Sequence, residues 1–213
     1  MFVETLTAAA YELLKSIGRL ELPSPFYLAG GSAAALHLGH RVSIDLDFFT
    51  QDPAYDMEAM LRALSSIGRL DVQQQAAGTL IGTLKQVQTS FFLYPYPLLR
   101  PLKELEKVRI ADLYDIALMK IIAITQRGTR RDFIDLYFIC RSGMKLAALL
   151  EDIAKKYLSI HYPSYHILRS LVYFADAEKD APPRLLAAWD WEQIKFFFEA
   201  EVRGLMGRLG SEL

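Results

Sequence analysis

The stretch from Val42 to Phe49 constrains the fold most, because apolar and polar side chains alternate strictly along most of it. Successive side chains of a β-strand point to opposite faces of the sheet. One face would carry four apolar residues: Val42, Ile44, Leu46 and Phe48. The other would carry Ser43, Asp45, Asp47 and Phe49. The pattern therefore predicts a strand with a buried face and a mostly polar face that bears two carboxylates.

The two aspartates of this strand predict a metal site. Residues two apart on a strand point the same way, with Cα atoms roughly 6.5–7 Å apart. Carboxylates so placed repel each other unless a cation lies between them. Mg²⁺ binds carboxylate oxygens together with substrate phosphates, and it can stabilise both oxygens of a phosphoryl-type transfer. We therefore expect Asp45 and Asp47 to hold Mg²⁺; an exposed strand face with solvated carboxylates is the alternative.

A glycine pair lies between two short apolar segments. Residues 26–29 predict a buried strand, and residues 32–38 predict a helix that begins immediately after Gly30 and Gly31. Free N–H groups and the positive dipole end of a helix N-terminus bind phosphate oxygens, and glycine allows a close approach. Gly30, Gly31 and Ser32 are therefore predicted to cradle phosphates. If the glycine pair is considered alone, a plain strand-to-helix turn with Ser32 as N-cap is the simpler interpretation. The aspartate pair on the next strand favours a phosphate-binding loop instead.

Two further polar residues, Arg41 and Ser43, lie between the glycines and the aspartates and are predicted to contact the same substrate. The chain lacks the Gly-Lys-Ser/Thr ending of a P-loop, so ATPase chemistry of that kind is excluded. The single cysteine, Cys140, excludes a disulfide within the chain. No uncharged apolar run approaches the ~20 residues of a membrane span, and no basic region of a signal peptide is present, so we expect a cytoplasmic protein.

The later half holds a second group of candidate residues on two predicted helices. On the first helix, Lys120 and Arg127 share a face. On the second, Asp132 and Asp135 share a face, and Arg131 is predicted to pair with Asp135 at i, i+4. The functional interpretation is that Lys120 contacts the triphosphate while Asp132 orients Lys120 or serves near the acceptor. The alternative is a solvated, salt-bridged helix pair.

The remaining patterns predict an α+β protein. The first half begins with a helix over residues 3–19, which is followed by the strand, glycine pair, helix and strand described above. It continues with a helix over 56–67 and ends with a three-stranded meander over 70–75, 79–86 and 87–94. The proline-rich segment 95–101 marks a boundary near residue 100. Five helices follow, over 112–127, 130–142, 145–158, 165–176 and 190–206. We expect a catalytic α+β core over residues 1–100 and a helical domain over 101–213 that completes the site.

The segments 28–49 and 120–135 together resemble the polymerase β-like nucleotidyltransferase superfamily, and within it the AbiEii/AbiGii-type toxin family of abortive-infection and toxin–antitoxin systems. That family pairs a Gly-Gly-Ser loop with an Arg-x-Ser-x-Asp-x-Asp strand, as here in residues 30–32 and 41–47. Its later helical lysine and its Arg-Asp-x-x-Asp segment match Lys120 and residues 131–135.

The resemblance implies a mixed sheet flanked by helices and a Mg²⁺-dependent transfer of an NMP group from an NTP to a hydroxyl. It further implies a toxin that modifies an acceptor, with RNA (tRNA) as the leading expectation, and a separate antitoxin protein as partner. The net charge of −1 excludes a broadly basic nucleic-acid binder, but residues 120–145 hold six Lys/Arg against two Asp, which suits a triphosphate or an RNA backbone.

The sequence departs from the superfamily pattern at one position. Related enzymes commonly carry a third carboxylate on a neighbouring strand, and the corresponding segment 87–94 has no acidic residue. Either Asp132 or Asp135 takes that role or catalysis is weakened. Two alternatives follow: an NTP-binding module without activity that acts through a protein partner, and an enzyme that modifies a small-molecule hydroxyl.

A small cluster of rings remains: His161, Tyr162, Tyr165 and His166. No acidic residue or cysteine lies at ligand spacing around them, which disfavours a metal site. Aromatic side chains can stack on nucleobases, but helix packing is the simpler interpretation of this cluster.

Overall fold

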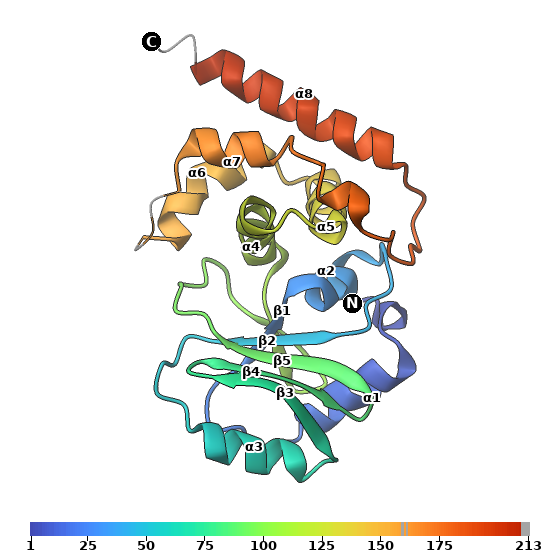
Figure 1. Cartoon of the computed structure of the whole chain (residues 1–213), viewed down its shortest axis with the longest axis vertical. Coiled ribbons are helices and arrows are strands. Elements are labelled where there is room, and N and C mark those ends of the chain that lie inside the picture. The colour runs from blue at the N-terminus through green and yellow to red at the C-terminus, as the bar shows by residue number, and fades with distance from the viewer. Residues whose placement is uncertain (159, 161, 210–213) are drawn as a thin grey trace.

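The computed structural model describes residues 1–158, 160 and 162–209. Its centre is a seven-stranded mixed sheet with the order β3-β4-β5-β2-β1-β7-β6. In Figure 1 helices α1 and α3 lie on one side of this sheet, and α2, α4 and α5 lie on the other. The last helices, α6, α7 and α8, lie further from the sheet and cover α4 and α5. This arrangement confirms the predicted α+β fold with a helical C-terminal half.

The sheet combines parallel and antiparallel pairs. Its strands are β1 (Tyr27–Ala29), β2 (Leu46–Thr50), β3 (Leu70–Ala76), β4 (Thr79–Leu84), β5 (Val87–Leu93), β6 (Lys103–Leu105) and β7 (Val108–Ile110). Strand β2 pairs antiparallel with β1 and parallel with β5. The predicted meander is present, and its β4–β5 turn carries positive φ at Lys85 (48°) and Gln86 (67°), as a two-residue type I′ hairpin requires.

The prediction of one strand over residues 42–49 is wrong in its first half. Strand β2 begins only at Leu46, and Ile44 is 63% exposed while Ser43 is buried. The backbone N–H of Val42 donates to Arg184 O (2.9 Å), and that of Ser43 donates to Thr5 O (2.7 Å). Because these bonds leave the sheet and turn Ser43 inward, the alternation is reversed before Leu46.

The sheet continues beyond residue 100 through a hairpin that the sequence did not predict. Strand β7 pairs parallel with β1, with Leu28 opposite Ile110, and β6 pairs antiparallel with β7. Each of these strands has only three residues, too few to show a period. A division into two domains near residue 100 stays a prediction.

The helices follow the predicted order, but α2 begins two residues earlier than predicted, at Gly30, α8 ends three residues later, and the other helices are shorter than predicted. The helices are α1 (Ala8–Ile17), α2 (Gly30–Leu38), α3 (Met57–Ser65), α4 (Leu113–Gln126), α5 (Arg130–Arg141), α6 (Leu146–Lys156), α7 (Ser164–Ser170) and α8 (Trp191–Leu209). The predicted helix over 3–19 is divided into a 3₁₀ turn, Val3–Thr5, and α1, because Thr7 caps α1 by accepting from the N–H of Ala10. Among the described residues, no helix has the length and apolarity that a membrane crossing needs.

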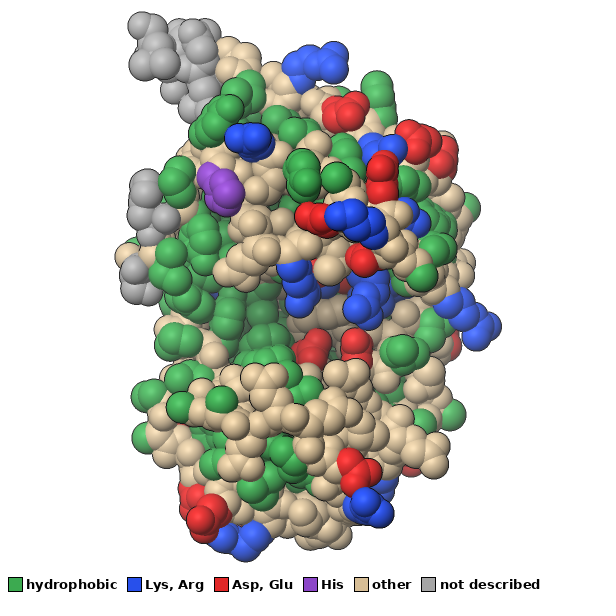
Figure 2. Space-filling view, in the orientation of Figure 1, with side chains coloured by type: hydrophobic (Ala, Val, Ile, Leu, Met, Phe, Trp, Pro, Cys, Tyr) green, Lys and Arg blue, Asp and Glu red, His purple; other side chains and the backbone are tan. Residues whose placement is uncertain are grey.

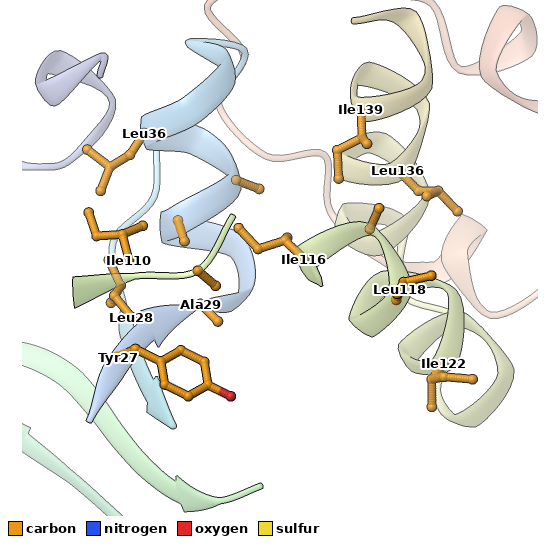
Figure 3. Packing of buried hydrophobic residues seen from close by; sticks show 14 of the residues in the cluster. Tyr27, Leu28, Ala29, Leu36, Ile110, Ile116, Leu118, Ile122, Leu136 and Ile139 are labelled. Atoms are coloured by element: carbon orange, nitrogen blue, oxygen red, sulfur yellow. The ribbon is translucent and has the colours of Figure 1, made fainter. Parts of the chain in front are cut away.

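The core between β1, β7, α2, α4 and α5 fixes the glycine turn at Gly30 and Gly31 to the helical half. Figure 3 shows Leu28 of β1 and Leu36 of α2 on one side of this core, and Ile116 of α4 and Leu136 of α5 on the other. These four side chains are fully buried, and each contributes roughly 1.5–3 kcal/mol relative to exposure. The N-terminus of α2 is thereby held in a fixed position relative to α4.

A buried ion pair attaches the proline-rich segment to the helices. Asp115 accepts from Lys156 Nζ (2.7 Å) and from the N–H groups of Leu99 (3.0 Å) and Arg100 (2.9 Å), and Lys156 also donates to Pro97 O (2.8 Å). Both charged side chains are fully buried. A buried charge left without its partner is strongly destabilising, whereas an intact pair is tolerated.

We expect Asp115→Asn to lower the free energy of unfolding by about 3–5 kcal/mol, because it leaves the Lys156 ammonium buried without a counter-charge. Urea unfolding followed by circular dichroism measures the change. Asp176→Asn is the matched control, since Asp176 pairs with Lys179 at an exposed site, and it should shift the midpoint very little. Equal effects of the two substitutions would contradict the importance of the buried pair.

Candidate active site

A cleft of about 660 Å³ lies between one face of the sheet and helices α4 and α5. In Figure 2 it crosses the middle of the visible face, with acidic side chains on its lower edge and basic side chains on its upper edge. Hydrophobic side chains line its other end. The polar end is lined by Gly30, Gly31, Arg41, Asp45, Asp47, Ser90, Lys120, Arg127, Arg131 and Asp132. Seven of the nine residues predicted for the site are in this set.

The other two predicted residues, Ser32 and Ser43, are buried and stand behind the cleft. Ser32 Oγ lies 2.9 Å from Ser43 Oγ and within hydrogen-bonding reach of the carbonyl oxygen of Asp45. Ser43 Oγ donates to Asp45 Oδ1 (3.1 Å). These hydroxyls therefore hold the backbone and the carboxylate of Asp45, a role different from the predicted contact with phosphate.

Both glycines of the loop are required by their neighbours. Gly30 has a φ of +65°, and a Cβ at this position would lie 3.2 Å from Asp47 Oδ2. A Cβ at Gly31 would collide with the guanidinium of Arg41. Ala29, the N-cap of α2, offers no side-chain acceptor, so the first N–H groups of the helix are directed to the cleft without a side-chain cap.

Asp45 and Asp47, on either side of Leu46 at the start of β2, both line the cleft and are both half-buried. Burial, with the charge of Asp45 as a smaller contribution, raises the pKa of the Asp47 carboxyl above its usual value. A cation between the two carboxylates would offset both effects. Arg131 Nη1, from α5, lies 3.6 Å from Asp45 Oδ2 and supplies part of that charge.

The predicted pairing of Arg131 with Asp135 is wrong. Arg131 is half exposed and reaches across the cleft to Asp45, whereas Asp135, one turn further along α5, is fully buried. Asp135 accepts from Arg41 Nε (2.6 Å) and Nη2 (2.9 Å), and from His40 Nε2 (2.8 Å). Lys120 Nζ lies 2.6 Å from Asp135 Oδ2. These buried donors occupy the carboxylate that the i, i+4 pattern assigned to Arg131.

Lys120 lies at the top of the cleft between two carboxylates. Its Nζ is 2.8 Å from Asp132 Oδ1 and 2.6 Å from Asp135 Oδ2. Asp132 also accepts from Arg127 Nε (2.9 Å) and from Thr129 Oγ1 (2.7 Å). Burial alone would raise the pKa of Asp132, but the charges of Lys120 and Arg127 lower it well below its usual value. The geometry agrees with an orienting role for Asp132, and the donors around it make it a poor base.

Sequence reasoning missed the contact of His40 with Asp135, because these residues are distant in sequence. It also missed Thr129, whose hydroxyl bonds to Asp132 three residues later and could have been expected from that local spacing. In the register of the sheet, Asp47 of β2 lies opposite Ser90 of β5. Strand β5 has no acidic residue, and the residue opposite Asp47 carries a hydroxyl instead of a carboxylate.

The sequence profile of the nucleotidyltransferase AbiEii toxin family, a type IV toxin–antitoxin system, matches residues 12–202. The chain belongs to the AbiEii nucleotidyltransferase toxin family. This AbiEii-family chain is 38% identical to protein aq_aa25 of Aquifex aeolicus (strain VF5) over 196 residues, which cover 90% of this chain and 93% of the relative.

Two solved structures have a similar fold. JHP933 from Helicobacter pylori has a TM-score of 0.55 at 18% identity, with 96% of this chain and 91% of that chain covered. The antibiotic-resistance factor ANT(2'')-Ia has a TM-score of 0.50 at 14% identity, with 74% of this chain and 91% of that chain covered. The family confirms the resemblance drawn from the sequence and identifies the chain as a nucleotidyltransferase.

The residues of the lower edge fit the divalent metal that the family implies. Asp45 and Asp47 offer hard oxygen ligands on one side of the cleft, and burial together with the charge of Asp45 raises the pKa of Asp47, which a bound cation would counter. Within the described part of the chain, no three His, Cys, Asp or Glu side chains cluster as a metal cage. Such a metal would thus take its other ligands from phosphates and water, as Mg²⁺ commonly does.

We expect Asp135→Asn to lower the free energy of unfolding by about 3–5 kcal/mol at neutral pH, because it leaves buried Arg41 and Lys120 short of negative charge. Urea unfolding measures the change, and Glu192→Gln on the exposed face of α8 is the control.

Asp135→Asn should also change how the free energy of unfolding depends on pH. Burial opposes ionisation of Asp135, but the charges of Arg41 and Lys120 outweigh it and hold the pKa of that carboxyl well below its usual range. The stabilisation is therefore present above the unfolded-state pKa of about 3.9 and is lost as the pH falls through the lower folded-state value. The difference between wild type and Asp135→Asn should shrink below about pH 4. A constant difference down to pH 2 would contradict this explanation.

Proposed function

We propose that this cleft transfers an NMP group from a Mg²⁺-bound NTP to a hydroxyl of RNA, with tRNA as the first acceptor to test. One observation carries the proposal: two carboxylates, Asp45 and Asp47, face the cations Lys120, Arg127 and Arg131 across one cleft, beside an N-terminus of α2 without a side-chain cap. This arrangement can hold a metal ion and a triphosphate at the same time.

Asp45 and Asp47 would hold Mg²⁺, which would supply positive charge to the phosphate oxygens and to the leaving oxygen. The N–H groups at Gly30 and Gly31 would bind the β- and γ-phosphates. Lys120 has three N–H donors and is held by two carboxylates, so its third donor is the one that a phosphate in the cleft would meet.

Two exposed arginines would complete the phosphate site. Arg127 and Arg131 have side chains that are 63% and 51% exposed, and both line the cleft. Arg131 would move from Asp45 to the phosphates when a metal ion takes its place beside that carboxylate. Arg41, which the sequence predicted as a substrate contact, would instead position Lys120 through their shared partner Asp135.

In the proposed reaction an oxygen of the acceptor hydroxyl attacks the α-phosphorus in line with the bond to the β-phosphate. That bond breaks, and pyrophosphate leaves with its electron pair while the proton of the acceptor hydroxyl passes to water in the open cleft. The protein contributes position and charge complementarity. The low pKa values of Asp132 and Asp135 argue against either residue as the base that the sequence analysis considered.

The setting that we propose follows from the family. A type IV toxin–antitoxin family implies a separate antitoxin protein that restrains this chain, and an NTP-dependent toxin would act in the cytoplasm. The exposed arginines on the upper edge of the cleft favour an acceptor with a phosphate backbone.

A second candidate function rests on Ser90. Because this hydroxyl lies opposite Asp47 on β5, the cleft lacks a third carboxylate on the neighbouring strand. The chain would then be a binding module that takes up Mg·NTP without transferring it and acts through a protein partner.

Transfer of label from each α-³²P NTP, with Mg²⁺, into total tRNA, total protein and small hydroxyl acceptors tests the proposal. We expect label in tRNA with wild type and at least about 100-fold less with Asp47→Asn, which loses a metal ligand. Asp71→Asn, at an exposed position of β3, is the control and should transfer normally.

Three other outcomes decide against parts of this proposal. Near wild-type transfer by Asp47→Asn would overturn the metal assignment. Label in a small molecule alone would replace the RNA acceptor. Binding of Mg·NTP with no label and no pyrophosphate from any acceptor would favour the binding module. Urea denaturation tests whether Asp47→Asn loses activity through unfolding. This variant should be at least as stable as wild type, because it removes a charge that burial disfavours.

A further inference from the structure

The far end of the cleft is aromatic. Beyond the polar residues its lining contains six rings: Phe49, Phe92, Tyr94, Tyr96, Tyr157 and Tyr162. Figure 2 shows hydrophobic side chains that reach into the hollow beside the acidic pair. A closed core would explain such a cluster, but these side chains border the same open cleft as Asp45 and Asp47.

The sheet places the rings in line with the carboxylates. Asp47 and Phe49 point to the same face of β2, and their partners on β5 are Ser90 and Phe92. One two-residue step along either strand, roughly 6.5–7 Å, therefore leads from the predicted metal site to a pair of rings. The pairing continues to Tyr94, whose N–H donates to Thr50 O (2.7 Å).

Helix α4 lines the side of the aromatic end of the cleft that faces strands β2 and β5. Four of its residues line the cleft with the spacing of one helix face: Met119, Ile122, Ala123 and Gln126. Three of them are apolar. Gln126 adds an amide with both donors and an acceptor. Lys120 and Arg127, which we assign to the phosphates, come from the same helix.

We call the aromatic end of the cleft, between these rings and α4, the aromatic slot. The tyrosines at its end contact one another. The hydroxyls of Tyr94 and Tyr157 are 2.5 Å apart, and the ring of Tyr96 lies 4.7 Å from the centroid of each. The ring of Tyr162 lies 5.6 Å from that of Tyr157. Edge-to-face packing of this kind stabilises the arrangement of the rings at the end of the cleft.

We propose that this aromatic slot is the subsite for the base of the NTP, an inference that rests on the proposed function. A slot with flat apolar walls and few polar groups at its edge suits a nucleobase, which stacks on rings and is recognised at its edge. The base of the NTP is favoured over a base of the acceptor because the slot follows the Asp47 site along the same two strands, with room for one ribose between them.

The slot also gives a role to one residue of the His/Tyr cluster. Tyr162 lines the cleft, whereas Tyr165, 64% exposed, and His166 do not. His161 lies outside the described residues. Tyr165 is therefore a matched control on the neighbouring turn for substitutions at Tyr162.

The test compares two ligands by calorimetry in the presence of Mg²⁺: α,β-methylene NTPs with each of the four bases, and inorganic tripolyphosphate. We expect wild type to bind at least one NTP analogue about tenfold or more tightly than tripolyphosphate. Tyr96→Ala and Tyr162→Ala should each weaken the NTP analogue by about 5- to 100-fold, the range of one base–aromatic contact. Their affinity for tripolyphosphate should not change, which shows that the fold is intact. Tyr162→Phe, which keeps the ring, and Tyr165→Ala should bind as wild type does.

The remaining outcomes separate this inference from the function on which it rests. Equal affinity of wild type for NTP analogues and tripolyphosphate would overturn the base subsite and leave the phosphate site intact. Failure of wild type to bind either ligand would overturn the proposed function itself. Unchanged NTP affinity in Tyr96→Ala and Tyr162→Ala, with a raised KM for the acceptor, would assign the slot to the acceptor and overturn the inference.

Discussion

The carboxylate of Asp135 is fully buried and joins three segments that are far apart in the sequence. From α5 it reaches Arg41 and His40, which follow α2, and Lys120 of α4. A buried charge is tolerated only when it is paired and hydrogen-bonded, so these contacts must form together. Together with the apolar core between α2, α4 and α5, this group of contacts sets the position of the glycine loop relative to Lys120.

The two pairs of aspartates divide their tasks according to their surroundings. Asp132 and Asp135 lie among cations that hold their pKa values low, and both serve to position Lys120. Asp45 and Asp47 lie on the opposite edge, where burial and mutual repulsion raise the pKa of Asp47. Asp132 and Asp135 already have cations beside them, whereas a cation between Asp45 and Asp47 would offset their repulsion. In the proposed function, the first edge would accept phosphates and the second a metal ion.

Local sequence patterns predicted the elements that carry the site. The glycine pair before an apolar helix, the alternation from Leu46 onward and the helical face of Lys120 and Arg127 needed only neighbouring residues to be interpreted. Where tertiary contacts compete, the patterns failed. Ile44 follows the alternation and is nevertheless exposed, because the backbone of Val42 and Ser43 bonds to segments outside the sheet.

The pairing of charges was the least predictable part. Spacing alone assigns Arg131 to Asp135, yet Arg41, more distant in sequence, takes that partner and Arg131 faces Asp45. The convergence of β2, β5 and the tyrosines of two later segments into one aromatic slot likewise needs the sheet register, which no single segment contains.

The most direct measurement is a crystal structure of the protein with Mn²⁺ and an α,β-methylene NTP, with the metal located by its anomalous scattering. We expect an anomalous peak bound by oxygens of Asp45 and Asp47, with the phosphates at the N-terminus of α2 and Arg131 moved away from Asp45 toward them. A metal peak elsewhere, or a bound nucleotide with Arg131 still paired to Asp45, would contradict the assignment of this cleft as the transfer site.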